Sequence, residues 1–334
     1  MVLWNRLWKH IYEKKLVNKL ENNPMPSYKT ALVTGGAGFI GSHIVDALIR
    51  RRIRVYVIDD LSTGLRSNVN PNARFIQMSV TSPRLPSVLR KIKPDVIFHL
   101  AAQADLRCSV QDPPNDARTN ILGTLALAHV AGRIGVKKFI FTSTGGALYS
   151  DDIRPPYSEA VSPCPISPYG IAKRCAEMYL EYECNKHNLK TVVLRLSNVY
   201  GPRQAMRGEA GVISIFARRM SRGEQVIING DGKNTRDYVY VSDVVDAQMY
   251  AMSKQVSGVF HIGTGRETSV NAIFYKMNKI IGGKMKETHG PACEGEVKRS
   301  SLDARKARRE LGWAPKVKLE EGLLKTVAWF QKLK

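Results

Sequence analysis

The stretch Thr34-Gly35-Gly36-Ala37-Gly38-Phe39-Ile40-Gly41 decides the fold of this chain. It lies between an apolar run, residues 30–33, and an amphipathic helical segment, residues 43–50. Gly35 permits a tight turn, Gly38 lets the backbone approach a pyrophosphate, and Gly41 lets the helix pack closely against the strand. The helix N-terminus then faces the phosphates, so the stretch predicts a site for a dinucleotide cofactor.

An acidic pair, Asp59-Asp60, ends the next apolar run, 18 residues beyond Gly41. A carboxylate at this distance from the turn accepts hydrogen bonds from the hydroxyls of the adenosine ribose. It would also repel a 2′-phosphate, so the pair favours NAD over NADP as the cofactor.

The alternation of apolar runs and helical stretches continues along the chain. Further runs lie at residues 55–58, 75–77, 96–100, 139–143 and 191–196. Continuous apolar strands belong to a parallel sheet covered on both faces, which predicts an α/β fold, a Rossmann-type doubly wound parallel sheet. After Asn198 the rhythm breaks into Gly/Pro-rich loops, with helices expected near 212–222 and 242–253. We therefore expect an NAD-binding domain over residues 28–197, joined by some later segments, and a smaller C-terminal α/β lobe over 198–334 that mainly binds substrate.

A tyrosine and a lysine stand four residues apart in Tyr169-Gly170-Ile171-Ala172-Lys173, just after Pro168. This spacing places both side chains on one face of a helix. A phenol with a pKa near 10 is a weak base, but a neighbouring ammonium group favours the phenolate and lowers that pKa. Residues 141–144 precede the pair at the predicted carboxyl end of a strand, where open α/β sheets bind ligands. The pair therefore predicts an acid/base that acts on an alcohol.

Charge and cysteine content bear on the class of protein. With 51 Lys+Arg against 29 Asp+Glu the net charge is +22, but the basic residues are dispersed and accompany no nucleic-acid-binding motif. We interpret them mainly as solvated basic faces, with attraction of anionic ligands or membrane as the alternative, and expect no nucleic-acid partner. The five cysteines form no CxxC pair and no cluster with histidine, so neither a disulfide framework nor a metal site is expected, and the location is predicted to be cytoplasmic.

Residues 1–27 form a basic amphipathic extension. Apolar side chains such as Leu3, Leu7, Ile11 and Leu20 fall on one helical stripe, with lysines interspersed. The extension lacks the apolar segment and cleavage signature of a signal peptide. Three interpretations stay open: a helix that packs on this protein or a partner, a helix in peripheral contact with an anionic membrane surface, and a start codon placed too far upstream.

Further motifs follow one another in order within residues 29–330. They are His99-Leu100-Ala101-Ala102, Asn120, Thr142-Ser143-Thr144, the Tyr169–Lys173 segment, Arg195-Leu196-Ser197-Asn198-Val199-Tyr200-Gly201-Pro202-Arg203, Gly230-Asp231-Gly232 and Arg236-Asp237-Tyr238. Together with the glycine turn they resemble the extended short-chain dehydrogenase/reductase family. Within that family the likeness is closest to the UDP-glucose (UDP-galactose) 4-epimerases.

The resemblance implies a role for each matching residue. The implied catalytic residues are Thr144, which hydrogen-bonds the sugar 4-OH, Tyr169, the base, and Lys173, which holds the nicotinamide ribose and tunes the tyrosine. The implied cofactor-binding residues are Gly35, Gly38, Phe39, Ile40, Gly41, Asp59, Asp60, Leu61, Ser62, Thr63, Gly64, Ser79, Val80, Leu100, Ala101, Ala102, Gln103, Asn120, Tyr169, Lys173 and Ser197. The implied substrate-binding residues are Thr144, Asn198, Val212, Ile227, Asn229, Arg236, Glu296 and Ser300. The implied partners are a UDP-sugar and a second copy of the chain in a homodimer.

The residues after Thr144 indicate the reaction. Dehydratases of the family carry an Asp-Glu pair there and decarboxylases a nearby Glu, whereas this chain has Gly145-Gly146-Ala147. Without a second acid/base the expected chemistry is reversible oxidation at one carbon. In that reaction Tyr169 takes the 4-OH proton as hydride passes to NAD, the 4-keto sugar turns over, and hydride and proton return.

The sequence thus predicts an NAD-dependent 4-epimerase of UDP-hexoses, with UDP-galactose and UDP-glucose as substrates. The alternatives are a 4-epimerase of UDP-N-acetylhexosamine or of a uronic acid, a related sugar-nucleotide dehydrogenase, and a non-catalytic NAD-binding member of the family.

Three positions depart from the family pattern. Ser79 replaces the usual Asp that meets the adenine, and Cys293 falls where the family has a diphosphate-binding Arg. Loss of that arginine removes a charge-assisted contact of roughly 1.5–3 kcal/mol, for which Lys298 or Arg299 are the candidate replacements. Ser300 stands where the family carries a bulky aromatic at the sugar pocket, which favours admission of an N-acetyl group.

Overall fold

Seven parallel strands form the central sheet, in the order β10-β6-β5-β4-β1-β2-β3. The computed structural model describes residues 28–204, 211–292 and 297–333. The strands are β1 (Thr30–Thr34), β2 (Arg54–Asp59), β3 (Arg74–Gln77), β4 (Val96–His99), β5 (Lys138–Thr144), β6 (Lys190–Leu196) and β10 (Gly258–Ile262). The doubly wound α/β fold predicted from the sequence is confirmed, and each predicted strand lies within one residue of its expected bounds.

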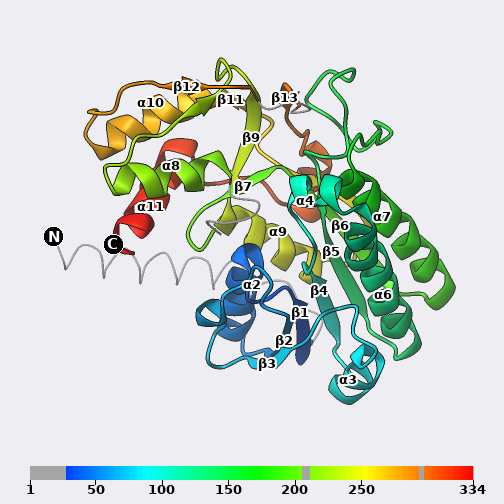
Figure 1. The fold of residues 1–334 in the computed structure, drawn as a ribbon. Coiled ribbons are helices and arrows are strands. Elements are labelled where there is room, and N and C mark those ends of the chain that lie inside the picture. Colours follow the sequence, from blue (N-terminus) through cyan, green and yellow to red (C-terminus); the bar gives the residue numbers. More distant parts are fainter. Residues whose placement is uncertain (1–27, 205–210, 293–296, 334) are drawn as a thin grey trace.

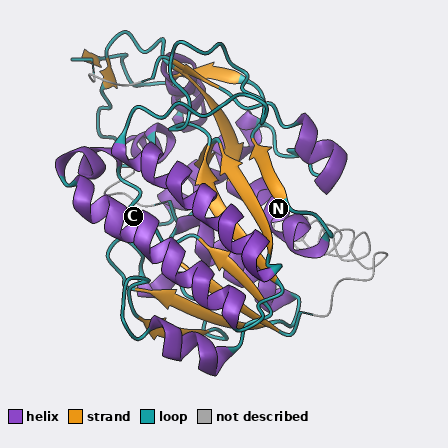
Figure 2. Cartoon of the chain, turned by 90° about the vertical axis from the view of Figure 1, so that its right-hand side faces the viewer, coloured by secondary structure: helices purple, strands orange, loops and turns teal. Residues whose placement is uncertain are grey.

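Helices cover both faces of the sheet, which explains why its strands are apolar on both sides. On one face α2 (Phe39–Arg50) and α9 (Val241–Ser253) pack in one apolar core, and on the other α3 (Leu85–Ile92), α6 (Thr124–Arg133) and α7 (Pro168–His187) pack in a second. Side chains of β1 alternate between the two cores: Ala31 and Val33 belong to the first and Leu32 to the second. In Figure 1, α6 and α7 lie side by side beside the sheet, and Figure 2 shows this helix layer in front of the strands.

The chain adds strands β2 and β3 on one side of β1 and then crosses to the other side of β1, where it adds β4 and the strands that follow. The topological switch point therefore lies between β1 and β4. A crevice at the carboxyl ends of the strands is expected at such a switch point. The turn after β1 and the loop after β4 both reach it, so the fold places the glycine-rich stretch at the standard ligand position of an open α/β sheet.

The C-terminal part contributes a second, smaller group of elements. Its strands are β7 (Asn198–Tyr200), β8 (Ile228–Asn229), β9 (Thr235–Tyr240), β11 (Glu267–Ser269), β12 (His289–Gly290) and β13 (Arg299–Ser300). Its helices α8 (Val212–Ser221), α10 (Val270–Ile281) and α11 (Leu319–Gln331) pack around a third apolar core and gather away from the central sheet in Figure 1. Strand β9 joins β11 and β13 and also pairs with β7, which continues the chain from β6.

Short helical segments complete the described chain. They are the 3-10 turn η1 (Arg66–Asn68), the helices α4 (Leu106–Gln111) and α5 (Pro113–Ala117), and the π-helical turns η2 (Arg118–Gly123) and η3 (Ala307–Leu311). Among the helices described, none combines the length and apolarity needed to cross a bilayer. The expectations for residues 1–27, Cys293 and Glu296 lie outside the described residues.

One element boundary differs from the sequence prediction, and the later segments that were expected to join the first unit can now be identified. Helix α2 begins at Phe39 rather than His43, because Gly38 already serves as its N-cap and the glycine-rich stretch supplies its first turn. Helix α9 and strand β10 belong to the central sheet and its covering layer, although both follow Asn198. Buried residues of α9 such as Val244 and Ala247 share the core of α2, so the chain returns to the first unit after beginning the second.

Candidate active site

The turn between β1 and α2 forms a cradle that only glycine fits. Gly35 has φ +71°, and a Cβ there would lie 2.7 Å from the Ala101 backbone nitrogen. A Cβ on Gly41 would lie 2.1 Å from the Gly35 carbonyl oxygen. Because the atoms that would be contacted belong to the backbone, they cannot move aside as the end of a flexible side chain can. Any larger residue at Gly35 or Gly41 would therefore force the turn open. The turn therefore meets the geometric requirement for close approach of a pyrophosphate to backbone N–H groups.

Asp59 braces this cradle from the end of β2. Its two carboxylate oxygens accept hydrogen bonds of 2.9 Å from the backbone nitrogens of Ala37 and Leu61. Burial is the main cause that raises the pKa of Asp59, and these two hydrogen bonds oppose the rise. Each oxygen keeps a second lone pair for a ribose hydroxyl.

The loop Leu61, Ser62, Thr63 and Gly64 is held by the same acidic pair. Asp60 is exposed and accepts from the backbone nitrogen and hydroxyl of Ser62 at 3.0 and 2.6 Å. A Cβ on Gly64 would lie 2.9 Å from the Cβ of Ala37, so this loop packs directly on the glycine turn. Its predicted cofactor contacts thus lie beside the cradle.

The loop after β4, residues 100–103, forms the opposite wall of the cradle. Backbone nitrogens of Leu100 and Ala101 lie 3.3 Å from the Thr34 hydroxyl. Asn120 is buried and fastens the loop, since its amide accepts from the Gln103 backbone nitrogen at 3.0 Å and donates to the Gln103 carbonyl at 2.8 Å. Asn120 therefore positions the loop in this structure, and its direct contact with a cofactor stays a prediction.

The predicted catalytic helix begins as the sequence suggested. Ser167 caps α7 by accepting from the Gly170 backbone nitrogen at 3.2 Å, and Pro168 occupies the first turn. A Cβ on Gly170 would lie 2.2 Å from the Ala147 carbonyl oxygen, so the helix start packs against the loop that follows Thr144. This contact brings the strand end of Thr144 and the helix of Tyr169 to one place.

Lys173 lies between the tyrosine and the sheet. Its Nζ donates to the Thr142 carbonyl oxygen at 3.0 Å and lies 5.9 Å from the centroid of the Tyr169 ring. Tyr169 is 8% exposed and Lys173 only 4%, so their attraction acts in a partly water-excluded site. A cation at this distance favours the phenolate form of Tyr169, as the proposed acid/base requires.

A buried ion pair joins the strand and the helix that carry the predicted catalytic residues. Glu177, one turn beyond Lys173, receives the Ser143 hydroxyl at 2.6 Å and two guanidinium hydrogen bonds from Arg195 of β6 at 3.0 and 2.6 Å. Arg195 also donates to the Tyr149 hydroxyl at 2.8 Å. Burial alone would lower the pKa of the Arg195 guanidinium, but the hydrogen bond to Glu177 outweighs this effect, so the pKa is raised. Ser143 immediately precedes Thr144, so this network fixes β5, β6 and α7 relative to one another beneath the catalytic residues.

The predicted substrate residues converge from several elements. Asn198 on β7 stands in register with Tyr238 of β9, and Arg236 of β9 stands in register with Ser300 of β13. The Asn198 side-chain oxygen lies 3.9 Å from the Cβ position of Gly146, just beyond Thr144. Arg236 donates to the Thr235 carbonyl at 2.9 Å. The β7–β9 pair thus places the Asn198 amide next to the loop that follows Thr144, with Arg236 two residues from Tyr238, the register partner of Asn198.

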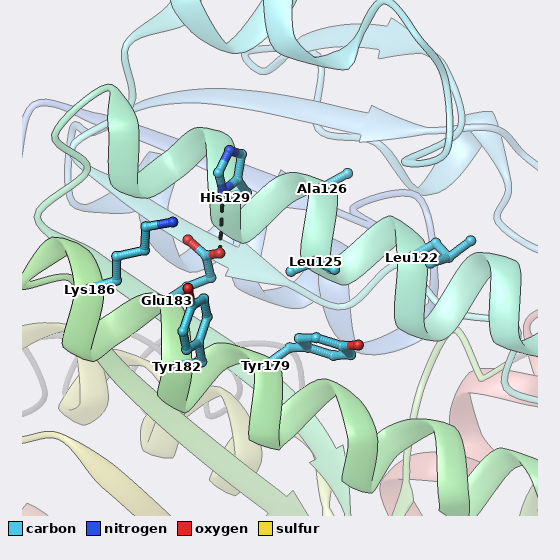
Figure 3. Close-up of a pocket in the computed structure, with 8 residues that line it drawn as sticks. All are labelled: Leu122, Leu125, Ala126, His129, Tyr179, Tyr182, Glu183 and Lys186. Atoms are coloured by element: carbon cyan, nitrogen blue, oxygen red, sulfur yellow. Dashed lines mark hydrogen bonds and ion pairs between the residues drawn. The ribbon is translucent and has the colours of Figure 1, made fainter.

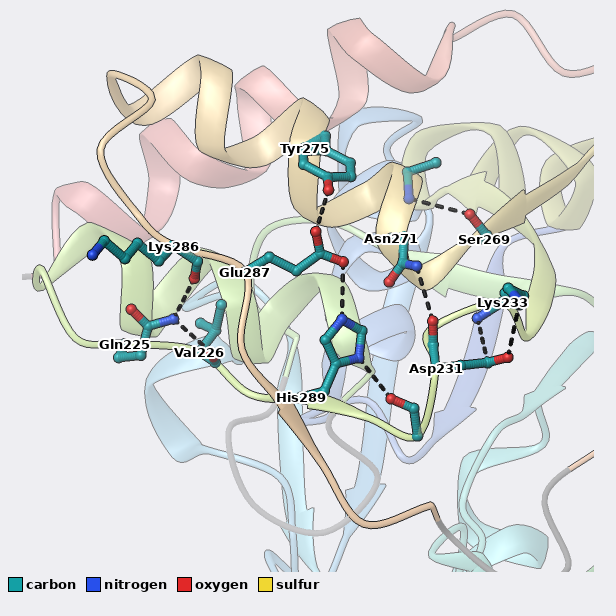
Figure 4. A network of polar contacts seen from close by, with 12 residues as sticks. Gln225, Val226, Asp231, Lys233, Ser269, Asn271, Tyr275, Lys286, Glu287 and His289 are labelled. Atoms are coloured by element: carbon teal, nitrogen blue, oxygen red, sulfur yellow. Dashed lines mark hydrogen bonds and ion pairs between the residues drawn. The ribbon is translucent and has the colours of Figure 1, made fainter.

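Val212, Ile227 and Asn229 lie farther along the same lobe. Val212 begins α8, Ile227 is 50% exposed, and the exposed Asn229 ends β8. The β8–β12 pair that carries Asn229 is fastened by His289, which contacts the Gly230 carbonyl at 2.6 Å and Glu287 at 2.9 Å, while Tyr275 donates to Glu287 (Figure 4). The hydrogen bond to Gly230 and the neighbouring Glu287 raise the pKa of His289.

The structure also shows where the residues that depart from the family pattern lie. Ser79 follows β3, and its hydroxyl pairs with that of Thr81 at 2.9 Å, while Val80 beside it is buried. Arg299, one of the two candidate replacements for the expected diphosphate-binding arginine, makes two guanidinium hydrogen bonds of 2.8 Å to Glu267. Ser300 is only 5% exposed, two residues before Leu302, whose side chain packs on Gly145.

Sequence reasoning missed the Ser143–Glu177–Arg195 network. Arg195 is part of the Arg195–Arg203 motif, but the spacing of residues in the sequence does not indicate that it pairs with Glu177, 18 residues earlier. The sequence contains only a weak indication of this pair. Glu177 lies on the side of the predicted catalytic helix that faces the sheet, and Arg195 lies inside an apolar strand. Either charge needs a partner if it is buried.

The site fits NAD on three observations of this structure. The backbone leaves no room for a Cβ at Gly35 or Gly41, the carboxylate of Asp59 faces the same turn, and the buried hydroxyl oxygen of Ser197 just after β6 has no hydrogen-bond partner within the described chain. An orphaned buried hydroxyl is uncommon and suits a position completed by a ligand.

Comparison with known proteins agrees with this geometry. Residues 31–263 match the model of the NAD dependent epimerase/dehydratase family. A putative UDP-glucose 4-epimerase of Methanocaldococcus jannaschii is 41% identical over 300 residues, which cover 90% of this chain and 98% of that protein.

Solved structures agree equally well. A UDP-glucose 4-epimerase of Thermotoga maritima, solved with UDP-glucose, has 51% identity and a TM-score of 0.89, with coverage of 91% of this chain and 99% of that one. A UDP-N-acetylglucosamine 4-epimerase of Methanobrevibacter ruminantium, solved with UDP-N-acetylmuramic acid, has 33% identity and a TM-score of 0.87, covering 92% and 100%.

The fold and the site together define a nucleotide-cofactor enzyme of the extended short-chain dehydrogenase/reductase type. The chain belongs to the NAD dependent epimerase/dehydratase family. The predictions of fold, family and NAD as cofactor are confirmed.

Proposed function

We propose that this protein is an NAD-dependent 4-epimerase that interconverts UDP-galactose and UDP-glucose. The observation that carries the proposal is the juxtaposition of Thr144, Tyr169 and Lys173 beside a glycine cradle, with Gly145, Gly146 and Ala147 where a second acid/base would stand. The similarity to UDP-glucose 4-epimerases over nine-tenths of the chain supports the same activity.

Each residue of the chain has a distinct task in this reaction. Bound NAD supplies a group that accepts hydride from C4 of the sugar and returns it. Tyr169 takes the proton of the 4-OH and later gives it back, and Lys173 favours the phenolate that makes this transfer possible. Thr144 offers its hydroxyl oxygen at the strand end to orient the sugar 4-OH. The uncharged Gly145-Gly146 surface leaves the hexose room to turn while the nucleotide stays held.

Recognition of the UDP portion rests on the smaller lobe. We propose that Asn198, Val212, Ile227 and Asn229 hold the uridine and that Arg236 binds the diphosphate, because a guanidinium meets phosphate oxygens bidentately. This division of labour corresponds to the proposed NAD-binding unit, residues 28–197 with its returning segments, and the substrate unit within 198–334.

A second substrate class is favoured by Ser300. Its small side chain lies on β13 next to Arg236, where a bulky aromatic would fill the sugar pocket. A UDP-N-acetylhexosamine is therefore the second candidate substrate, consistent with the likeness to an N-acetylglucosamine epimerase.

Turnover on a panel of UDP-sugars tests the proposal. The full-length protein without added NAD is expected to convert UDP-galactose to UDP-glucose until the two reach equilibrium, measured by anion-exchange separation of the products. UDP-N-acetylgalactosamine and UDP-galacturonic acid distinguish the alternatives by their relative kcat/KM. The proposal is wrong if no epimer forms from any of these substrates even after NAD is supplied.

We also propose that the protein is a homodimer through the exposed face formed by η2 and α7. Large apolar side chains on this face are solvent-exposed in the single chain, among them Leu122, Ile171, Met178 and Tyr182 at 58%, 49%, 55% and 57%. Exposed apolar patches of this kind are characteristic of association surfaces. Light scattering of wild type and of Met178→Glu checks this, since the substitution is expected to yield monomer.

For residues 1–27 we propose peripheral contact with an anionic membrane surface by a protein located in the cytoplasm. The support is the sequence alone: lysines interspersed with an apolar helical stripe, and cysteines without a pairing pattern. Cosedimentation with anionic vesicles is expected for the full chain and not for a variant lacking these residues. Equal binding of both proteins to the vesicles would refute the role of the extension.

A further inference from the structure

A cluster of two histidines and a glutamate lies outside the proposed active site, where α6 and α7 pack together. His129 comes from α6, and Glu183 and His187 come from successive turns of α7. One ligand atom from each residue lies within 4.8 Å of the others. Two imidazoles and a carboxylate are a donor set that suits Zn²⁺.

The glutamate is the least expected member of the cluster. Its side chain is 3% exposed, and its second oxygen, Oε2, makes no hydrogen bond within the described chain; neither does Nε2 of His187. Burial of a carboxylate without such a partner is costly. Both unsatisfied atoms point at each other across 3.3 Å, so the cluster holds two potential ligands with no other partner.

Distances within the cluster are long for charge-assisted hydrogen bonds, although His129 Nδ1 still lies within hydrogen-bonding reach of Glu183. His129 Nδ1 and His187 Nε2 each lie 3.3 Å from a different oxygen of Glu183. Charge-assisted hydrogen bonds are shorter, about 2.7–2.9 Å. Two ligands on a tetrahedral Zn²⁺ with bonds of about 2.0–2.1 Å are separated by roughly 3.3 Å, the length of each contact taken singly. Because the two histidines face different oxygens and the three ligand atoms lie within 4.8 Å of one another, the side chains would close in slightly around one ion.

Neighbouring residues make room for the cluster. A Cβ on Gly132 of α6 would lie 2.6 Å from Cδ2 of the His187 ring, so only glycine there lets this imidazole approach α6. Beside the cluster a groove of ≈ 440 Å³ opens, lined also by Leu125, Tyr179 and Tyr182 (Figure 3). The side chains of His129 and His187 are 40% and 20% exposed in the single chain, so an ion can enter before a second copy covers the groove at Tyr182.

We propose that His129, Glu183 and His187 bind one Zn²⁺ per chain through three protein ligands, with water from the groove as the fourth. The carboxylate neutralises half of the ionic charge, and the metal satisfies the two atoms that otherwise have no hydrogen bond. Because the ligands come from two helices, the ion would cross-link α6 and α7. This proposal departs from the sequence prediction of no metal site, and the titration below decides between them.

Zinc titration of the full-length protein, prepared without a histidine tag and freed of metal by a chelator, tests this proposal. Calorimetry is expected to show one Zn²⁺ per chain, and Co²⁺ in its place to show the visible spectrum of a tetrahedral site. His129→Asn, Glu183→Gln and His187→Asn are each expected to weaken Zn²⁺ binding more than the roughly 10–100-fold that loss of an outer-shell partner costs.

Two control variants separate the site from general zinc binding. Lys186→Gln removes a cation whose Nζ lies 5.6 Å from the Tyr182 ring in the same groove, and it is expected to leave affinity equal or higher. His289→Asn removes the histidine of another His–Glu pair and is expected to leave the titration unchanged. Wild type that binds no zinc, or zinc affinity that persists in His129→Asn, which alters a partly exposed helix position, would overturn the proposal.

Discussion

Replacement of Tyr169 by phenylalanine is expected to lower the turnover of UDP-galactose by roughly 10²–10⁴-fold. The substitution removes the only atom of this side chain that can take the 4-OH proton, while the ring keeps its packing at 8% exposure. The neighbouring Lys173 remains anchored on the Thr142 carbonyl at 3.0 Å, so the shape of the site is retained. Product formation under saturating substrate measures the effect.

The same variant is expected to retain its cofactor. The glycine cradle and Asp59 are built from β1, α2 and β2 and keep their shape without the phenol, so NAD released by denaturation should equal that of wild type. Tyr179→Phe is a matched control, because Tyr179 lies on the same helix but is 43% exposed on its outer face. A near wild-type rate in Tyr169→Phe would show that another group is the base.

Replacement of Glu177 by alanine is expected to lower the free energy of unfolding by about 3–5 kcal/mol. The change leaves the guanidinium of Arg195, which is 3% exposed, buried without its carboxylate, and it removes the acceptor of the Ser143 hydroxyl. Because Ser143 adjoins Thr144, turnover should fall as well in the fraction that stays folded. Denaturation in urea, followed by circular dichroism, measures the loss of stability.

Controls on the same helix separate the buried ion pair from helix composition. Glu181→Ala changes an exposed glutamate of α7 and is expected to leave stability within about 0.5 kcal/mol of wild type. In an Arg195→Met background, Glu177→Leu should cost far less than Glu177→Ala does in wild type, because no charge is left buried alone. A loss below about 1 kcal/mol for Glu177→Ala would contradict the role given to this pair.

Local patterns in the sequence were sufficient for the first half of the fold. The glycine-rich stretch, the apolar strands and the i,i+4 pair of Tyr169 and Lys173 depend on residues within one or two turns of each other, and backbone geometry converts such spacings directly into shared faces. These features determined the cofactor site and the catalytic helix.

Only the tertiary structure decided which distant side chains meet. The sequence contains no spacing that joins Ser143 to Glu177, Asn120 to the loop after β4, or His129 to Glu183, which is 54 residues away. The return of α9 and β10 to the first unit, and the engagement of Arg299 by Glu267, likewise depend on how the two groups of elements pack. Contacts of this kind arise from burial, which obliges each enclosed polar group to find a partner wherever the packing of helices and sheet brings one.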